Sequence, residues 1–300
     1  MYFGTLEAGG TKMVLSVGNE KNELLEQASI LTEAPEKTIP AMIDWFRDKR
    51  IVSLGIGTFG PVDLKKDSPT YGWITSTPKP GWRNRPLLQP MLDALGVPGL
   101  IDTDVNAAAL AEWKLGAAKG LNSCLYVTVG TGIGAGLVIE GKLVHGLVHP
   151  EMGHMLLRQE PDDQTPVGFC PYHAGCLEGL ASGPAIEKRW GKKGYELPPD
   201  HPAWTLEASY LAQMCMNAVC AFSPEKIILG GGVMQQKQLF PLIRRKTLAL
   251  LNGYVQAGAI LDNIDNYIVE PGLGTKSGAT GALLLARQAH ADAQNPECLQ

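Results

Sequence analysis

The chain has 300 residues, of which 45% are hydrophobic, and a formal net charge of -4 from 26 Lys and Arg against 30 Asp and Glu. A chain of this length can bury a large core and is typical of two domains. The lack of a basic run argues against a nucleic-acid partner, and because no stretch approaches twenty apolar residues, we expect no membrane span. We therefore expect a cytoplasmic protein that binds neither nucleic acid nor a membrane.

Two pairs of strands, each joined by a glycine-containing turn, are predicted in similar sequence contexts. The four strands cover residues 2–6, 13–17, 124–129 and 137–140. The first pair is joined by Glu7-Ala-Gly-Gly-Thr-Lys12 and the second by a glycine turn at residues 130–136. Because each turn leads into another strand and not into a helix, we expect two hairpins whose tips expose backbone N–H groups.

Helices and strands alternate after each hairpin, which predicts an α/β fold in two halves. In chain order we expect a helix at 37–49, a strand at 51–56, helices at 104–114 and 206–221, a strand at 226–229 and a helix at 277–290. Asp104 is placed to be the N-cap of its helix. The predicted domains are residues 1–117 and 118–287, with the last helix, at about 288–300, joined to the first domain.

Two His and two Cys in a short window have the spacing of a metal site. Cys170, His173 and Cys176 form a C-x2-H-x2-C cluster downstream of His154. These residues supply the four N and S donors that tetrahedral Zn²⁺ prefers, and four protein ligands close the coordination shell, which favours a structural over a hydrolytic zinc. Disulfides among the six Cys and unrelated buried thiols stay open as alternatives.

Two carboxylates flank this cluster. Glu151 lies in the same turn as His154, in the sequence E-M-G-H, and Glu178 follows Cys176 by two residues. A metal bound by the cluster would therefore fix both carboxylates in space.

Glycine clusters follow three of the predicted strands and are suited to phosphate binding. They lie at residues 9–10, 130–136 and 230–232. Glycine lacks the Cβ that would block a phosphate, and N–H groups in a tight turn form an anion-binding concavity. A plain tight turn explains any one cluster taken alone. Lys12 is equally interpretable as a phosphate contact and as a solvated charge at a strand end.

Two common nucleotide-binding motifs are excluded. Residues 55–60 match G-x-G-x-x-G after a strand, but Pro61 and a turn-rich stretch follow where a dinucleotide site needs a helix N-terminus. No G-x-x-x-x-G-K-[ST] sequence occurs. A chain that binds ATP without either motif would bind it between hairpins.

Six motifs along nearly the whole chain resemble those of the ROK family of sugar kinases and repressors. They are Glu7-Ala-Gly-Gly-Thr-Lys12, Asp104-Val-Asn-Ala-Ala-Ala109, the glycine turn from Thr128 to Gly136, Glu151-Met-Gly-His154, the window from Cys170 to Glu178, and Leu229-Gly-Gly-Gly232. The resemblance implies an actin/hexokinase-like (ribonuclease H-like) α/β fold of two domains with an interdomain cleft. It also implies ATP with Mg²⁺, a hexose substrate, a structural Zn²⁺ and a homodimer.

The resemblance also assigns roles to particular residues. Asp104 would be the general base that takes the proton from a sugar hydroxyl, and a carboxylate at a helix N-terminus stays ionised as this role requires. The implied sugar contacts are Gly60, Pro80, Trp82, Thr103, Glu151, His154 and Glu178. The implied ATP contacts are Gly9, Gly10, Thr11, Lys12, Thr131, Gly132, Gly134, Gly230, Gly231 and Gly232. The implied metal ligands are His154, Cys170, His173 and Cys176. Trp82 could instead anchor its Pro-rich loop in the core.

The chain departs from the commonest family pattern at three positions. Glu7 stands where Asp is common, Thr103 where many glucokinases have Asn, and His173 where they have a third Cys. The motifs look like those of the fructokinase branch, which implies phosphorylation of D-fructose to D-fructose 6-phosphate by ATP. A broad-specificity hexokinase or mannokinase is the alternative. A non-catalytic sugar sensor is disfavoured by Asp104, and a repressor is disfavoured because no helix-turn-helix precedes the first strand.

Overall fold

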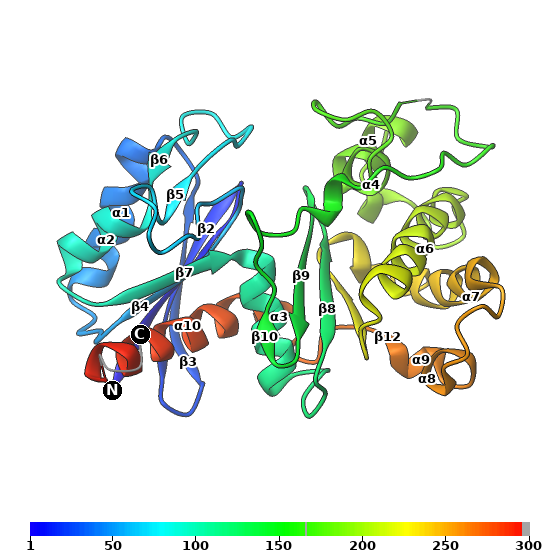
Figure 1. Ribbon diagram of the computed structural model, residues 1–300. Coiled ribbons are helices and arrows are strands. Elements are labelled where there is room, and N and C mark those ends of the chain that lie inside the picture. The colour runs from blue at the N-terminus through cyan, green and yellow to red at the C-terminus, as the bar shows by residue number, and fades with distance from the viewer. Residues whose placement is uncertain (166, 296–300) are drawn as a thin grey trace. The chain divides into compact units, whose positions relative to one another are not determined.

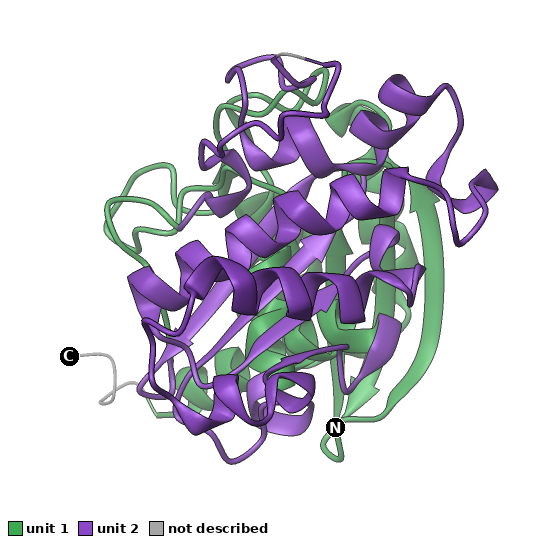
Figure 2. Cartoon of the chain, turned by 90° about the vertical axis from the view of Figure 1, so that its right-hand side faces the viewer, with its two compact units in different colours: residues 1–112, 143–149, 276–300 green, residues 113–142, 150–275 purple. Residues whose placement is uncertain are grey.

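The computed structural model describes residues 1–165 and 167–295, and its contacts divide the chain into two units. Unit 1 is Met1–Glu112, Leu143–His149 and the described residues from Lys276 onward. Unit 2 is Trp113–Lys142 and Pro150–Thr275 (Figure 2). The division into residues 1–117 and 118–287 stays a prediction about folding domains, and residues 296–300 of the predicted last helix lie outside the described residues.

Unit 1 is built on a five-stranded sheet with the order β3-β2-β1-β4-β7 (Figure 1). Its strands are β1 (Tyr2–Ala8), β2 (Lys12–Asn19), β3 (Leu24–Leu31), β4 (Leu54–Thr58) and β7 (Gly99–Thr103). The pairs β1–β2 and β2–β3 are antiparallel, whereas β1–β4 and β4–β7 are parallel. The short strands β5 (Trp73–Ile74) and β6 (Arg85–Pro86) form a separate antiparallel pair.

Helices cover the strands of unit 1. They are α1 (Pro35–Arg47), α2 (Leu88–Leu95), α10 (Ser277–Gln294) and the first part of α3 (Asp104–Leu115). Helix α1 buries Thr38, Met42 and Phe46, which recur at helical spacing on one face. Gly55 lets α10 approach β4, because a Cβ built on this residue would lie 1.9 Å from the carbonyl oxygen of Ala282. The C-terminal helix therefore belongs to the core of unit 1.

Unit 2 is built on a second five-stranded sheet, with the order β10-β9-β8-β11-β12. Its strands are β8 (Cys124–Val129), β9 (Ile133–Ile139), β10 (Lys142–Leu143), β11 (Ile227–Gly230) and β12 (Ile268–Val269). Strand β8 pairs antiparallel with β9 and parallel with β11, as β1 pairs with β2 and β4 in unit 1. The two predicted hairpins therefore open two sheets of the same strand arrangement.

The α-helices of unit 2 are α4 (Leu177–Ala181), α5 (Gly183–Trp190), α6 (Ala203–Phe222), α7 (Leu239–Leu251), α8 (Gly258–Leu261) and α9 (Ile264–Tyr267). Single 3₁₀ turns are η1 (Met152–His154), η2 (Gly194–Glu196), η3 (Val233–Gln235) and η4 (Gly274–Lys276). Helix α6 ends at Ser223, whose φ of 46° takes the left-handed conformation before Pro224. Among the described helices, none combines the length and apolar character needed to cross a membrane.

The predicted strand at 124–129 and helix at 104–114 are confirmed as β8 and α3. The predicted glycine turn is too long. Strand β9 begins at Ile133, and Gly134 and Gly136 pair with β8, so the turn itself is residues 130–132. Strand β3 was not predicted because its sequence, LLEQASIL, lacks regular alternation. None of its residues is buried, as suits an edge strand.

Candidate functional site

Three segments of unit 1 meet at one edge of its sheet. Strands β1, β4 and β7 run parallel, with Ala8 paired to Thr58 and Thr58 paired to Thr103. Their carboxyl ends therefore lie side by side, and in open α/β sheets ligands bind at this end. The residues that follow the three strands here are Gly9–Thr11, Phe59–Gly60 and Asp104.

Thr103 is the residue that caps helix α3. Its Oγ1 accepts a hydrogen bond from the backbone N–H of Asn106 at 3.1 Å, whereas Asp104 Oδ1 accepts from the adjacent Val105 N–H at 2.9 Å. The N-cap is therefore one residue earlier than predicted. Thr103 is only 3% exposed and its hydroxyl accepts this bond, so the structure gives it a capping role that the sequence reasoning had not assigned.

The first turn of α3 is held against two neighbouring backbones. A Cβ built on Gly57 of β4 would lie 3.4 Å from Asp104 Cα and 3.0 Å from Ala107 Cβ. One built on Gly281 of α10 would lie 1.8 Å from the carbonyl oxygen of Ala107. Because β4 and α10 both approach this turn so closely, the backbone that carries Asp104 has little freedom to move.

The turn between β1 and β2 uses one glycine for its own closure. The Gly9 N–H donates to the carbonyl oxygen of Lys12 at 3.0 Å, and the Gly9 carbonyl accepts from Thr32 Oγ1 at 2.8 Å. The Gly9 N–H is thus used within the turn itself. The space beside Gly10 is open, because a Cβ built on this residue would meet no heavy atom within 4 Å. The Lys79 ammonium donates to the Gly10 carbonyl, which brings to the turn a positive charge that sequence reasoning missed.

Glu7 lies partly buried near the end of β1, just before this turn. Burial raises the pKa of its carboxyl group, and the positive charge of Lys12 opposes that rise. A Cβ on Gly278 of α10 would lie 2.6 Å from Glu7 Cδ, so the helix fits closely over the carboxyl group. Lys12 therefore has an electrostatic partner within unit 1, a role that neither of its two sequence interpretations included.

Trp82 anchors its loop in the core. The side chain is 0% exposed, its Nε1 donates to the carbonyl oxygen of Glu33 at 2.8 Å, and its ring packs edge-on against Phe59 at 5.7 Å between centroids. A side chain with no exposed surface cannot close over a sugar, so the predicted sugar contact at Trp82 is not seen in this conformation. Pro80 lies on the exposed part of the same loop.

Two glycine turns meet at the corresponding edge of the unit 2 sheet. Strands β8 and β11 run parallel, with Thr128 opposite Gly230, so residues 130–132 and 231–232 follow them side by side. Gly231 has a φ of 91°, and a Cβ there would lie 2.4 Å from the carbonyl oxygen of Val129. The location predicted for Gly134 is wrong, because it pairs with Thr128 inside the ladder and does not lie in the turn.

Glu178 connects helix α4 to the first of these turns. Its Oε2 accepts a hydrogen bond from the Ile133 N–H at 2.9 Å, and a Cβ on Gly132 would lie 2.7 Å from the same oxygen. Burial and the negative charge of Glu178 together raise the pKa of Glu151 to about 7. The two carboxylates that flank the Cys/His window thus act on each other electrostatically.

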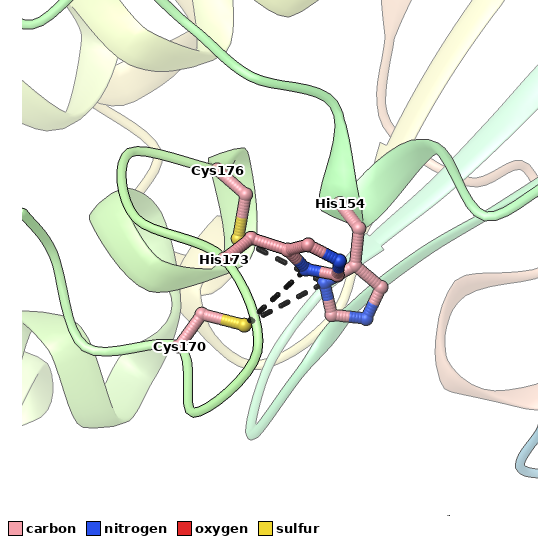
Figure 3. A group of neighbouring side chains, drawn as sticks. All are labelled: His154, Cys170, His173 and Cys176. Atoms are coloured by element: carbon pink, nitrogen blue, oxygen red, sulfur yellow. Dashed lines mark hydrogen bonds between the residues drawn. The ribbon is translucent and has the colours of Figure 1, made fainter. Parts of the chain in front are cut away.

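The four predicted metal ligands converge (Figure 3). Their donor atoms all lie within 4.8 Å of one another. His154 Nδ1 lies 3.8 Å from both Cys170 Sγ and Cys176 Sγ, and His173 Nδ1 lies 3.7 Å from Cys170 Sγ. Bond lengths of about 2.3 Å for Zn–S and about 2.0 Å for Zn–N give a tetrahedral N···S edge of about 3.5 Å, so the donor set fits a zinc ion.

The two Cys of the window are free thiols, as are the other Cys that the structure describes, at positions 124, 215 and 220. This removes the disulfide interpretation for these five residues. His154 presents Nδ1 to the sulfurs, so its Nε2 is left for a different partner. A metal-bound imidazole commonly donates its second N–H to an oxygen acceptor. His154 is thus suited to contact a metal with one nitrogen and a hydroxyl with the other.

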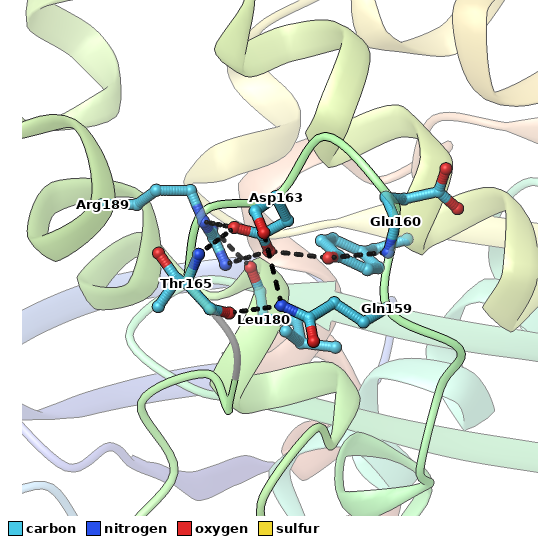
Figure 4. Close-up of polar contacts among 7 residues, drawn as sticks. Gln159, Glu160, Asp163, Thr165, Leu180 and Arg189 are labelled. Atoms are coloured by element: carbon cyan, nitrogen blue, oxygen red, sulfur yellow. Dashed lines mark hydrogen bonds and ion pairs between the residues drawn. The ribbon is translucent and has the colours of Figure 1, made fainter.

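A buried ion-pair network holds the loop that precedes the window (Figure 4). Arg189 of α5 donates to both carboxylate oxygens of Asp163, at 3.0 and 3.1 Å, and Tyr210 of α6 donates to Asp163 Oδ2 at 2.6 Å. Burial alone would raise the pKa of Asp163, but these bonds and the charge of Arg189 lower it. The pairing is long-range, so no local sequence signal predicts it.

The fold, together with the turns at the carboxyl ends of its parallel strands, defines the actin/hexokinase-like class of sugar kinases. The chain belongs to the ROK family, whose family model matches residues 3–289. It is 45% identical to the fructokinase of Pediococcus pentosaceus, over 96% of this chain and 99% of that protein, and 44% identical to the fructokinase of Zymomonas mobilis subsp. mobilis, over 95% and 96%. The crystal structure of a ROK hexokinase from Thermus thermophilus matches 97% of this chain and 100% of its own, with 29% identity and a TM-score of 0.79.

Proposed function

We propose that this protein transfers the γ-phosphoryl group of ATP to the 6-hydroxyl group of D-fructose. The observation that carries the proposal is the 45% identity to a fructokinase across 99% of that relative's length. A match of this extent spans the turns at the carboxyl ends of the strands, Asp104 and the Cys/His window together. The proposed activity therefore uses the whole chain and not one shared motif.

Asp104 is the proposed general base. Phosphoryl transfer leaves a protein little covalent work beyond holding the hydroxyl, the γ-phosphate and Mg²⁺ in line and neutralising charge. One proton must still leave the attacking hydroxyl, and a carboxylate at the positive end of α3 is suited to accept it. The close packing of Gly57 and Gly281 around this turn supports the role, because a base must be held in a fixed position.

Glu151, His154 and Glu178 are the proposed sugar contacts of unit 2. Ionised carboxylates accept hydrogen bonds from sugar hydroxyls, and two of them can recognise several hydroxyls at once. The bond from the Ile133 N–H fixes one oxygen of Glu178, which leaves its other oxygen for substrate. Gly60 and Pro80 stay proposed contacts from unit 1.

Turn residues at the two sheet edges are the proposed phosphate contacts. They are Gly10, Thr11, Thr131, Gly132, Gly231 and Gly232. Lys79 and Lys12 supply positive charge near the turn in unit 1. Mg²⁺ bound to the ATP phosphates would neutralise charge there, and Glu7 is the carboxylate of unit 1 that we propose as its protein contact.

His154, Cys170, His173 and Cys176 are the proposed ligands of a structural zinc. When bound, zinc would order the loop that presents His154 and Glu178, and it would take no part in proton transfer.

We further propose, on the family resemblance, that the protein is a homodimer. Sedimentation or light scattering of the purified protein tests this oligomeric state.

The proposed function is tested by measuring kcat/KM for fructose, mannose, glucose and N-acetylated hexosamines side by side, with ADP release as the readout. We expect the largest value for fructose. Comparable values for several hexoses would indicate the broad-specificity alternative, and a decisive lead for glucose would contradict the proposal. No ADP release with any hexose would indicate a sugar sensor.

A further inference from the structure

A second carboxylate lies buried beside the proposed base. Asp102 is 5% exposed and precedes Asp104 by two residues at the end of β7. Its Oδ1 accepts hydrogen bonds from the Thr103 N–H at 2.7 Å and from Asn106 Nδ2 at 2.8 Å. One oxygen of Asp102 thus connects the end of the strand to the first turn of α3, and Asp104 lies between the two points it holds.

The other oxygen of Asp102 faces a histidine from a distant part of the chain. His145 Nε2 lies 2.8 Å from Asp102 Oδ2. This histidine belongs to residues 143–149, which pack with unit 1 although the chain on both sides of them belongs to unit 2. At the end of the segment, buried His149 accepts a hydrogen bond from the Val62 N–H at 3.1 Å. Two histidines therefore fasten this segment, called the strap below, to unit 1.

The electrostatics favour a charged pair. A buried carboxylate is costly unless a cation or several hydrogen bonds compensate it. The hydrogen bond to Asp102 raises the pKa of His145, against the smaller opposing effect of burial, and the charge of Asp102 adds to the rise. Tyr71 is a further titratable group that interacts with Asp102, and its pKa is raised by burial and by the charge of Asp102.

We propose that Asp102 is a positioning residue for Asp104, and that its ion pair with His145 makes the placement of the base depend on the docking of the strap. This proposal rests on the proposed function of Asp104 and extends it. The strap ends two residues before Glu151, a proposed sugar contact. The same short stretch of chain therefore carries both the histidine that pairs with Asp102 and a carboxylate that is proposed to bind the sugar.

Three variants of His145 and one control separate positioning from simple stability. H145Q removes the cation from a half-exposed side chain, H145K keeps a cation at all pH values up to about 10, and H145F removes both charge and hydrogen bond. H290Q removes a histidine of unit 1 on α10, whose ring packs edge-on against Phe3 of β1 at 6.0 Å; in the sheet order, β4 separates β1 from β7. D102N tests the carboxylate itself, and the His145 series stays informative if D102N fails to fold.

The readouts are kcat and KM for fructose as functions of pH, with NMR titration of the His145 ring. For a group whose folded pKa is raised, the charged pair is complete at low pH and is lost as pH rises through that pKa. We expect wild-type kcat to fall on the alkaline side while KM changes little. H145Q and H145F should lower kcat by about 10- to 100-fold, the cost of a misplaced catalytic group, and H145K should retain kcat without the alkaline fall.

In the NMR titration, the His145 pKa should lie above its ordinary value in wild type and return toward it in D102N. A wild-type protein that phosphorylates fructose, with H145Q and H145F unchanged in kcat and pH profile, would overturn the positioning proposal while the proposed function stands. Equal losses in H290Q would also overturn it. A wild-type protein that phosphorylates no hexose would refute the proposed function, and the positioning proposal with it.

Discussion

The Oε2 atom of Glu178 accepts a hydrogen bond from the backbone N–H of Ile133, 2.9 Å away, at the point where the glycine turn of unit 2 becomes strand β9. A proposed sugar-binding carboxylate and a proposed phosphate-binding turn are thus held by one contact. Burial raises the pKa of Glu151, and the negative charge of Glu178 adds to that rise, so Glu178 also influences the protonation of its neighbour.

This arrangement predicts an acid limb in the pH profile of fructose phosphorylation. The pKa of Glu151 is raised from its ordinary value of 4.5 to about 7, so the group is protonated below that pH and ionised above it. If ionised Glu151 accepts hydroxyl hydrogens, kcat/KM for fructose should rise with pH through about 7. E178Q keeps an acceptor for Ile133 but removes the charge, so it should move this limb to lower pH. An unmoved limb in E178Q would show that the charge of Glu178 does not set it.

The Arg189–Asp163 pair should be important for stability. The two side chains are 6% and 0% exposed, so R189M leaves a buried carboxylate without its cation, which costs about 3–5 kcal/mol. Because the pKa of Asp163 is lowered, the wild-type stability from this pair should be present at neutral pH and lost as pH falls. Urea unfolding measures the change. K237M is the control, since the Lys237–Glu270 pair is about half exposed and should cost less than about 1 kcal/mol.

Removal of a bound metal should disorder one part of the loop and spare another. Chelation should abolish fructose phosphorylation and speed hydrogen exchange at residues 170–176, whereas residues 158–165 stay protected because Asp163 holds them to α5 and α6. C176S should lose zinc and activity together, and C220S, at an exposed thiol outside the window, should keep both. Full activity in protein shown by elemental analysis to be free of zinc would make the cluster irrelevant to catalysis.

Trp82 should matter for folding and not for sugar recognition. W82A removes a fully buried indole and should lower the free energy of unfolding by about 3–5 kcal/mol. W82F retains much of the packing but loses the bond to the Glu33 carbonyl, and its KM for fructose should stay within about twofold of wild type. A large rise in KM for W82F, with a normal melting temperature, would restore the predicted sugar contact.

Local sequence patterns predicted the structural features that depend on the spacing of residues within one short stretch of chain. The Cys/His window converges as its spacing indicated, because four donors within one short stretch leave few ways to fold. The repeated strand-turn-strand openings likewise predicted two halves, and each opening lies in a five-stranded sheet of the same arrangement. The end of each glycine turn was not predictable, because Gly134 in a strand and Gly132 in a turn look the same in sequence.

Contacts between distant segments escaped prediction for a different reason. His145 pairs with Asp102 across 43 residues, and Arg189 pairs with Asp163 across 26. Neither pair has a motif, since any His or Arg could in principle meet any carboxylate. The capping role of Thr103 was missed because a residue next to a proposed catalytic base invites a substrate role, although its hydroxyl serves the helix.

The most direct test compares fructose-dependent ADP release by wild type and D104N, purified in parallel and matched in melting temperature. We expect D104N to retain a KM within a few-fold of wild type and to have a kcat lower by about 10²- to 10⁴-fold, the contribution usual for a general base. Turnover by D104N near the wild-type rate would contradict the assignment of Asp104 as the base.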